Sequence, residues 1–266
     1  SDEAIIKCGS YTGNGTAGQE VNLGFEPQFV LLKGANAAST TWWMFDVMRG
    51  MVDGGVDERL RANATTKSLP LSTYGANLIK PTPTGFALET TSGEANNNGT
   101  LFVYMAIRRP HKPPEAGTDV FAIDTKTASS TNTPSYTSNF SVDLALRRDN
   151  ITSTSDSFEF ISRLTNSLIY ANQANAENSG GGTFLGYFAY NNGWASINGN
   201  DSNDYLYMFR RAPGFFDVAT YTGTGSAKTV DHNLGAVPEL MIVKVRNFTY
   251  NWFVYAAPQG NSKYGL

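Results

Sequence analysis

The clearest candidate for chemistry is a glycine-rich loop, Gly13-Asn-Gly15-Thr-Ala-Gly18, whose spacing matches that of a dinucleotide-binding turn. Such a loop binds a pyrophosphate where it follows a strand and opens a helix, with an acid about twenty residues further on. Here the loop precedes an apolar, strand-like run, and no acid stands at that place. We therefore interpret it as a turn, and we expect neither a bound nucleotide nor another cofactor.

Two further groups of polar residues carry weak signals for metal binding. The loop at 198–204 offers the carboxylates of Asp201 and Asp204 to a calcium ion, but its spacing departs from that of a calcium loop and no glutamate closes it. The two histidines, His111 and His232, are remote in the sequence from any cysteine or acidic cluster. We expect a solvated loop at 198–204 and no catalytic metal.

The acids Asp53, Asp57 and Glu58 stand in one short stretch, and a pair of carboxylates is what a glycosidase uses. No further motif anchors such a pair, so we predict no catalytic residues and no enzymatic activity. Cys8 is the single cysteine, which rules out an intrachain disulfide. We expect its side chain to be a small buried apolar group rather than a nucleophile.

Composition narrows the class of protein. The net charge is −3, and no basic run exceeds an Arg-Arg pair, so nucleic-acid binding has no electrostatic basis. No apolar run is long enough to cross a bilayer, which predicts no membrane insertion. Aromatic residues make up 12% and charged residues 16% of the chain, and polar turn residues are abundant. This profile is typical of short strands joined by many turns.

An internal repeat supplies the elements that position these residues. Residues 11–33 open with Tyr-Thr-Gly-x-Gly, and the same pattern returns at 221–244. In both copies a Leu-Gly pair and a proline, Pro27 or Pro238, precede an apolar strand. A divergent copy with Val142 in place of the proline lies midway. A period of roughly a hundred residues matches one independent domain.

We therefore predict an all-β protein of tandem antiparallel β-sandwich domains with a jelly-roll-like arrangement. The domains are 1–114, 115–213, and 214–266 as the first half of a third repeat. The apolar strands at 29–31 and 144–146 should be equivalent and buried on both faces. Residues 184–190 and 194–197 should form a hairpin around an Asn-Asn-Gly turn.

The last segment lacks counterparts of the later strands of the repeat. Its apolar strand at 240–243 would then have an uncovered face and an unpaired edge, which is costly in water. We expect either that the natural chain continues past Leu266, or that another subunit or the preceding domain completes the fold. The junction before this segment is short, which predicts close docking on the second domain.

Two sets of residues are candidates for contacts with other molecules. Trp42 and Trp43 are consecutive, so a strand directs one into the core and the other outward. Together with Trp252 in the last copy they form the predicted contact surface. The pairs Arg108-Arg109 and Arg210-Arg211 end the first two domains, either as interdomain or intersubunit ion pairs or as solvated strand ends.

The repeated motifs, with a closing Tyr-Met-Phe-Arg-Arg-Ala-Pro-Gly-Phe-Phe-Asp at 207–217, resemble repeat domains in tail-fibre and other virion structural proteins of marine bacteriophages, cyanophages among them. The resemblance covers the whole chain and is weakest in the middle copy. It implies a non-catalytic protein on the particle exterior, at the tail or capsid surface. Its expected partners are other virion subunits, including copies of itself, and a host surface glycan. No ligand residue carries over.

The leading hypothesis is a tail-fibre or adhesin-like component of a bacteriophage virion. Two alternatives stay open, a polysaccharide-degrading tail enzyme and a capsid decoration protein. An acidic cleft with a carboxylate pair of raised pKa would favour the enzyme. A large apolar interface between copies would favour the fibre or decoration roles.

Overall fold

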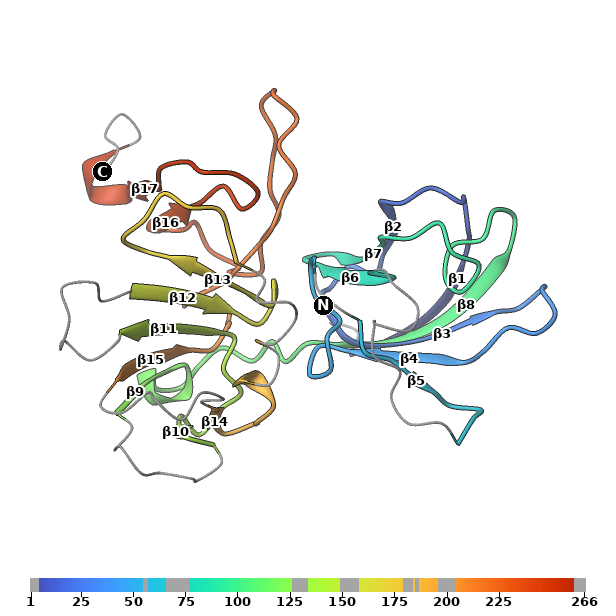
Figure 1. Cartoon of the computed structure of the whole chain (residues 1–266), viewed down its shortest axis with the longest axis horizontal. Coiled ribbons are helices and arrows are strands. Elements are labelled where there is room, and N and C mark those ends of the chain that lie inside the picture. Colours follow the sequence, from blue (N-terminus) through green and yellow to red (C-terminus); the bar gives the residue numbers. More distant parts are fainter. Residues whose placement is uncertain are drawn as a thin grey trace. The chain divides into compact units, whose positions relative to one another are not determined.

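The computed structural model describes residues 5–54, 57–65, 77–125, 134–148, 158–178, 184, 187–195 and 204–260. These residues form antiparallel sheets, with short 3-10 helices such as η2 (Gly117–Asp119) and η4 (Ala257–Gln259) (Figure 1). The predicted all-β class is therefore confirmed. The chain divides into two compact units, the first formed by residues 1–111 and 218–232, the second by 112–217 and 233–266.

The first unit is built from two facing sheets. Its strands are β1 (Ile6–Thr12), β2 (Gln19–Asn22), β3 (Pro27–Gly34), β4 (Trp43–Asp46), β5 (Leu60–Arg61), β6 (Ile79–Thr82), β7 (Gly85–Leu88) and β8 (Leu101–Arg108). A five-stranded sheet has the order β1-β8-β3-β4-β5, and a three-stranded sheet has the order β2-β7-β6. Apolar side chains from both sheets pack into one cluster, which includes Val30 and Phe45 from the large sheet and Phe86 and Leu88 from the small one.

The second unit repeats this construction and adds a hairpin. Its strands are β9 (Phe121–Thr125), β10 (Tyr136–Thr137), β11 (Leu144–Arg148), β12 (Phe158–Ser162), β13 (Ser167–Tyr170), β14 (Gly193–Trp194), β15 (Tyr205–Phe209), β16 (Leu240–Val243) and β17 (Phe253–Ala256). A five-stranded sheet has the order β13-β12-β11-β15-β9, and two-stranded sheets pair β10 with β14 and β16 with β17. Figure 1 shows the five strands as a ladder with β16 and β17 beyond β13.

The two large sheets have one topology. In each unit the first strand, β1 or β9, pairs with the last strand of the repeat, β8 or β15. That last strand also pairs with the apolar strand, β3 or β11. Two further strands follow, β4 and β5 or β12 and β13, and all pairs are antiparallel. Val30 and Ala145 are the fully buried residues at the centres of β3 and β11. The predicted equivalence of segments 29–31 and 144–146 is therefore confirmed by strand order. The domain boundaries and the jelly-roll-like arrangement stay predictions.

One backbone feature precedes the apolar strand in all three copies. Gly24, Asn139 and Gly235 each have a positive φ, of 80°, 62° and 67°. This left-handed conformation is routine for glycine, and asparagine is among the few other residues that adopt it readily. The middle copy thus keeps the turn although its sequence there has diverged.

A second signature of the repeat is a Gly-aromatic-Ala sequence that the sequence analysis missed. Gly85-Phe86-Ala87 opens β7, and Gly193-Trp194-Ala195 covers β14. Phe86 pairs with Val21 of β2, and Trp194 pairs with Tyr136 of β10. Both aromatic rings are fully buried. The signature therefore places one large ring of the small sheet in the core of each unit.

The apolar strand is not buried on both faces, so that prediction is wrong. In β3 the side chains of Val30 and Leu32 are fully buried, whereas Phe29 and Leu31 are half-buried. The reason is that the opposing small sheet covers one face only, and successive side chains of a strand point to opposite faces. In β11 the same alternation buries Ala145 between the half-buried Leu144 and Leu146.

The predicted hairpin around the Asn-Asn-Gly turn lies partly outside the described residues, since 185, 186, 196 and 197 are not among them. In its described part β14 pairs with β10, Tyr187 and Phe188 have 3-10 geometry, and the Ala195 amide donates to the Tyr187 carbonyl at 2.8 Å. Tyr187 stacks on Trp194 at 4.5 Å between ring centroids, and Phe188 is fully buried. Two consecutive rings directed into one core do not suit the alternation of a strand.

The third segment contains a hairpin that corresponds to β3 and β4 of the first unit. β16 pairs with β17 with Met241 opposite Tyr255, and β3 pairs with β4 with Val30 opposite Phe45. Aligning Pro27 with Pro238 places Met241 at the position of Val30, and aligning Trp42 with Trp252 places Tyr255 at the position of Phe45. The hairpin of the third segment therefore reproduces the register of a complete repeat.

Candidate contact surface

The two consecutive tryptophans lie on opposite faces, as predicted. Trp42 precedes β4, and 36% of its surface is exposed; the Lys33 ammonium lies 5.8 Å from its ring centroid. Trp43 is the first residue of β4 and is buried. Trp42 therefore remains a candidate for contacts with another molecule, whereas Trp43 belongs to the core and leaves the predicted contact surface.

Two arginines explain how the bulky Trp43 ring is accommodated. The guanidinium groups of Arg59 and Arg61 lie 4.7 and 4.9 Å from its centroid. Arg59 is itself buried and forms an ion pair with Glu94 at 2.8 Å. A cation over an indole face is stabilised by the ring quadrupole, more so when water is excluded. Trp43 therefore links the core to the charged end of β5.

Trp252 does not project freely from the molecule. Its ring lies 5.4 Å from that of Phe160 on β12, and its Nε1 donates to the carbonyl of Gln173 at 3.2 Å. Because Ile161 points into the core, Phe160 points to the outer face of the sheet. Trp252 thus attaches the third segment to the second repeat; its ring stays partly exposed, and its role in a surface that contacts other molecules stays a prediction.

Polar contacts reinforce this attachment within the second unit. Arg246 Nε donates to Glu177 Oε2 at 2.7 Å, and Ser167 donates to the same oxygen at 2.9 Å. The backbone amide of Glu177 donates to the Arg246 carbonyl at 2.7 Å, and that of Tyr250 donates to the Ala174 carbonyl at 2.9 Å. The third segment is therefore docked on the second repeat by the turn between its two strands.

The hairpin itself carries the largest run of exposed apolar residues in one strand. Leu240, Met241, Ile242 and Val243 are exposed over 59%, 42%, 49% and 37% of their surface. Val30 and Leu32 of β3, the counterparts of Met241 and Val243, are fully buried. Contiguous apolar surface of this kind marks sites of interaction with other proteins or membranes. This exposed strand is the strongest candidate contact surface among the described residues.

The residues considered for chemistry lie in structural roles. The loop at Gly13 is a turn: Gly13 N donates to the Thr100 carbonyl at 2.9 Å, and no helix follows it. Cys8 is exposed, so the expectation of a buried thiol is wrong; β1 is an edge strand whose alternate residues face outward. The described residues hold no group of three or more histidine, cysteine or acidic side chains suited to a metal. Asp201 lies outside these residues.

Among the acidic cluster, Asp57 has an unusual environment. It is fully buried, and its Oδ2 accepts hydrogen bonds from the backbone amides of Leu78 at 2.5 Å and Ile79 at 2.9 Å. Burial raises its pKa to about 7, although these donors and Arg59 favour the charged form. A carboxyl with no exposed surface cannot meet a substrate. Asp57 instead holds the start of β6 in place.

We expect this carboxyl to make the first unit less stable as pH rises from about 4 to about 7. The pKa of Asp57 is higher in the folded state than in the unfolded state, so between these two values only the folded state keeps the proton. The resulting stabilisation is complete below the unfolded-state pKa and is lost as the pH rises to the folded-state pKa. The change should be of the order of 3–4 kcal/mol. Asp57→Asn, which cannot ionise, should remove it. Urea unfolding of the wild type and of Asp57→Asn at several pH values checks this. If the difference between their free energies of unfolding is the same at every pH, the prediction is contradicted.

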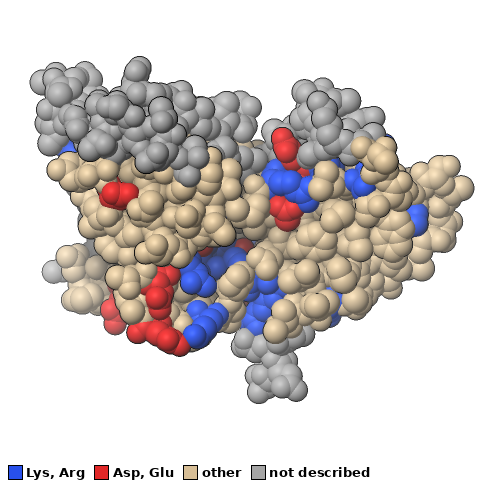
Figure 2. Space-filling view, turned by 90° about the horizontal axis from the view of Figure 1, so that it is seen from below, with Lys and Arg blue, Asp and Glu red and all other residues tan. Residues whose placement is uncertain are grey.

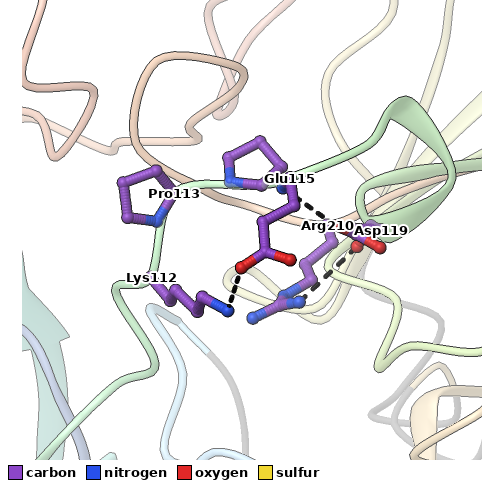
Figure 3. A pocket seen from close by; sticks show the side chains of 6 residues that line it. Lys112, Pro113, Glu115, Asp119 and Arg210 are labelled. Atoms are coloured by element: carbon purple, nitrogen blue, oxygen red, sulfur yellow. Dashed lines mark hydrogen bonds and ion pairs between the residues drawn. The ribbon is translucent and has the colours of Figure 1, made fainter.

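A small pocket lies where the second unit begins (Figure 3). Its lining includes Lys112, Glu115, Asp119 and Arg210. Lys112 pairs with Glu115 at 2.5 Å, and Asp119 accepts the backbone amides of Glu115 and Ala116, which lower its pKa. Arg210 donates to the Asp119 carbonyl at 3.5 Å. The polar groups bind one another, so the pocket is a braced turn rather than a ligand site.

The second arginine of each pair is buried beside an acid of its own unit. Arg109 Nε lies 3.5 Å from Glu26 Oε2, and Arg211 Nε lies 2.6 Å from Asp217 Oδ1. The solvated strand end is therefore wrong for these two residues. Arg211 pairs with an acid beyond the predicted boundary at residue 213, as an interdomain ion pair would, whereas Arg109 pairs within the first domain. Both guanidinium groups are at least nine-tenths buried, and a guanidinium removed from water needs a carboxylate partner.

Charge is sparse on the face of the molecule seen in Figure 2, where lysine, arginine and acidic side chains form small groups on a largely uncharged surface. This matches the low proportion of charged residues, 16%. Among the residues that the structure describes, no helix is both long and apolar enough to span a membrane.

The fold defines an all-β protein in which two five-stranded antiparallel sheets share one strand order. The family model of the domain of unknown function DUF7483 matches residues 3–110 and 210–264, and the chain belongs to this family. Each matched range contains one copy of the Tyr-Thr-Gly-x-Gly motif. No curated protein and no solved structure matches the chain.

Proposed function

We propose that this chain is a structural component of a bacteriophage virion, a tail-fibre or adhesin-like protein that contacts the host surface and has no catalytic role. The observation that carries the proposal is the third segment. It keeps the strand register of a complete repeat, yet it exposes the residues that form the core elsewhere. Such a segment is suited to assembly with other chains.

Two further features support an assembling role. The guanidinium groups of Arg109 and Arg211 pair with acidic side chains of their own units. We therefore assign them to stabilising the repeats rather than to binding a substrate. Trp42 offers a half-exposed indole ring on the first unit. Aromatic rings that are partly exposed to solvent and partly packed on apolar groups are common in surfaces that bind other molecules. The ligand that we propose for the Trp42 ring is a host surface glycan.

Immunogold electron microscopy of purified particles tests the location. An antibody raised against the purified chain should label the particle exterior at the tail, and sedimentation velocity should show a homo-oligomer. Label distributed over the capsid surface would favour a decoration protein instead. A monomer that releases sugars from host polysaccharide would overturn the proposal in favour of a tail enzyme.

A further inference from the structure

The large sheet of the first unit has one face that the small sheet does not cover (Figure 1). Val30, Phe45 and Phe102 point to the covered face and are fully buried, so the residues that alternate with them point outward. Strand pairing arranges the outward side chains in three rows, which we call the outer face. The first row is Ile6, Ile107, Phe29 and Asp46; the central row is Cys8, Met105, Leu31, Met44 and Leu60; the third row is Ser10, Val103, Lys33 and Trp42.

The outer face is apolar, and several of its side chains are open to solvent. Ile6 exposes 56% of its surface, Trp42 exposes 36%, and Cys8 is exposed. The central row has no charged side chain, and it contains Met44 and Met105, whose flexible side chains adapt to the shape of a partner. The cores of protein interfaces are likewise poor in charge and rich in methionine and aromatic rings.

The equivalent face of the second unit is covered by aromatic rings of the chain itself. By strand register Phe160 occupies the position of Met44. The Trp252 ring packs on Phe160, and the Phe216 ring packs on Phe209 of the same face, each with 5.4 Å between ring centroids. This face of the repeat is therefore a packing surface in the second unit, whereas in the first unit the same positions meet solvent.

The two charged side chains of the outer face suit a symmetric pairing. Lys33 lies in the third row and Asp46 in the first, on opposite sides of the central row. The Lys33 ammonium donates to the Thr40 carbonyl at 2.8 Å, and Asp46 forms an ion pair with Arg49. A two-fold axis along the central row turns the first row of one copy onto the third row of the other. Each Lys33 then lies beside the partner subunit's Asp46, so no charge is buried without an opposite one.

The outer face is also large enough for a stable dimer. Five strands about 4.8 Å apart, the longest of eight residues at about 3.4 Å each, give roughly 500 Å² in projection. The accessible area of side chains exceeds the projected area, so the face approaches the roughly 800 Å² per partner of a specific interface. The net charge of −3 adds little repulsion between copies.

We propose that the outer face binds the same face of a second copy of this chain, sheet against sheet, across a two-fold axis along the central row. The side chains of the two faces interdigitate as those of facing sheets do in a β-sandwich. Apolar burial supplies the affinity, and the contacts between Lys33 and Asp46 fix the orientation. The inference rests on the assembling role proposed above and names the surface through which copies meet.

The single cysteine reports on this arrangement, because the axis places Cys8 opposite the partner subunit's Cys8. Treating the full chain with a short bismaleimide should give covalent dimers. The control combines Cys8→Ser with Ile123→Cys, which moves the thiol to the equivalent exposed position of the second unit, since Ile123 pairs with Tyr207 as Cys8 pairs with Met105. Its yield should be about tenfold lower, because only associated thiols have a high effective concentration. Equal yields would overturn the proposal.

Sedimentation velocity with charged variants measures what the face contributes. Cys8→Lys sets two ammonium groups against each other in the centre of the interface and should raise the Kd of the dimer by about a hundredfold. Because Cys8 is exposed in the single chain, the variant should keep the thermal transition of the wild type. Ile123→Lys adds the same charge to the second unit and should leave the Kd unchanged. An unchanged Kd for Cys8→Lys would contradict the proposal.

The outcomes separate this inference from the proposed function. Oligomers of the wild type whose Cys8 cross-links no faster than the control thiol would overturn the inference and leave the assembling role in place. A wild-type chain that stays monomeric would overturn both the outer-face dimer and the homo-oligomer. A dimer that forms through the outer face, with no antibody label on the particles, would support the inference and remove the virion role.

Discussion

Replacing Gly193 by alanine should destabilise the second unit by about 3 kcal/mol and lower its thermal transition by roughly 10 °C. A Cβ at this position would overlap the Tyr136 carbonyl oxygen and lie 2.7 Å from Cγ of Pro134. Neither atom belongs to a flexible side chain, so β10 and β14 must separate. Gly85→Ala should do the same in the first unit, where the added Cβ would overlap the Val21 carbonyl oxygen.

Calorimetry with matched variants checks this result. Gly117→Ala and Gly93→Ala add the same methyl group in the second and first units, but the Cβ at Gly117 would meet open space and neither φ value is positive. The Cβ at Gly93 would lie 4.0 Å from Asn97 Cβ, an ordinary van der Waals contact. These controls should change stability by less than about 0.5 kcal/mol. If Gly193→Ala and Gly117→Ala have the same thermal transition temperature, β10 and β14 are not as closely paired as the structure shows.

The second large effect is expected from Arg211. Replacing it by methionine should cost about 3–5 kcal/mol, because a buried carboxylate at Asp217 loses the guanidinium at 2.6 Å. Adding Asp217→Asn should recover most of the loss, since the asparagine oxygen can still accept the Asn233 amide, which now donates to Asp217 at 2.7 Å. Urea unfolding of the two single variants and the double variant gives the coupling energy.

The equivalent substitution in the first unit is the comparison for this experiment. Arg109→Met removes the partner of Glu26 at 3.5 Å, a longer contact, and should cost less than Arg211→Met. A loss below about 1 kcal/mol for Arg211→Met would place this pair among ordinary surface ion pairs, contrary to its burial.

Much of the fold could be predicted from the sequence because two copies of the repeat have closely similar sequences. The Tyr-Thr-Gly-x-Gly motif, the proline before the apolar strand and the strand itself are local patterns. They identified β3, β11 and β16, and the exposed strand β16 is the candidate contact surface. Alternation also separated Trp42 from Trp43, since consecutive residues of a strand face opposite ways.

Pairings between distant strands could not be predicted in the same way. The sequence favoured a local hairpin at 184–197, but Trp194 pairs with Tyr136, and the nearby rings of Tyr187 and Phe188 fill the core. A strong turn signal gives the position of a bend and leaves open which strand lies beside it. Cys8 was misjudged for a related reason, because the sequence does not show which face of β1 the small sheet covers; Cys8 lies on the exposed face, between the half-buried Lys7 and Gly9.

The sequence by itself determined the repeated motifs and their strand class, because these depend on patterns within a few residues. Only the tertiary structure decided which charges are buried. Arg147 and Glu159, paired at 2.6 Å, occupy the cross-strand positions that Leu32 and Trp43 hold in the first unit. Such an exchange is tolerable only when both partners change together, and strand pairing alone brings them side by side.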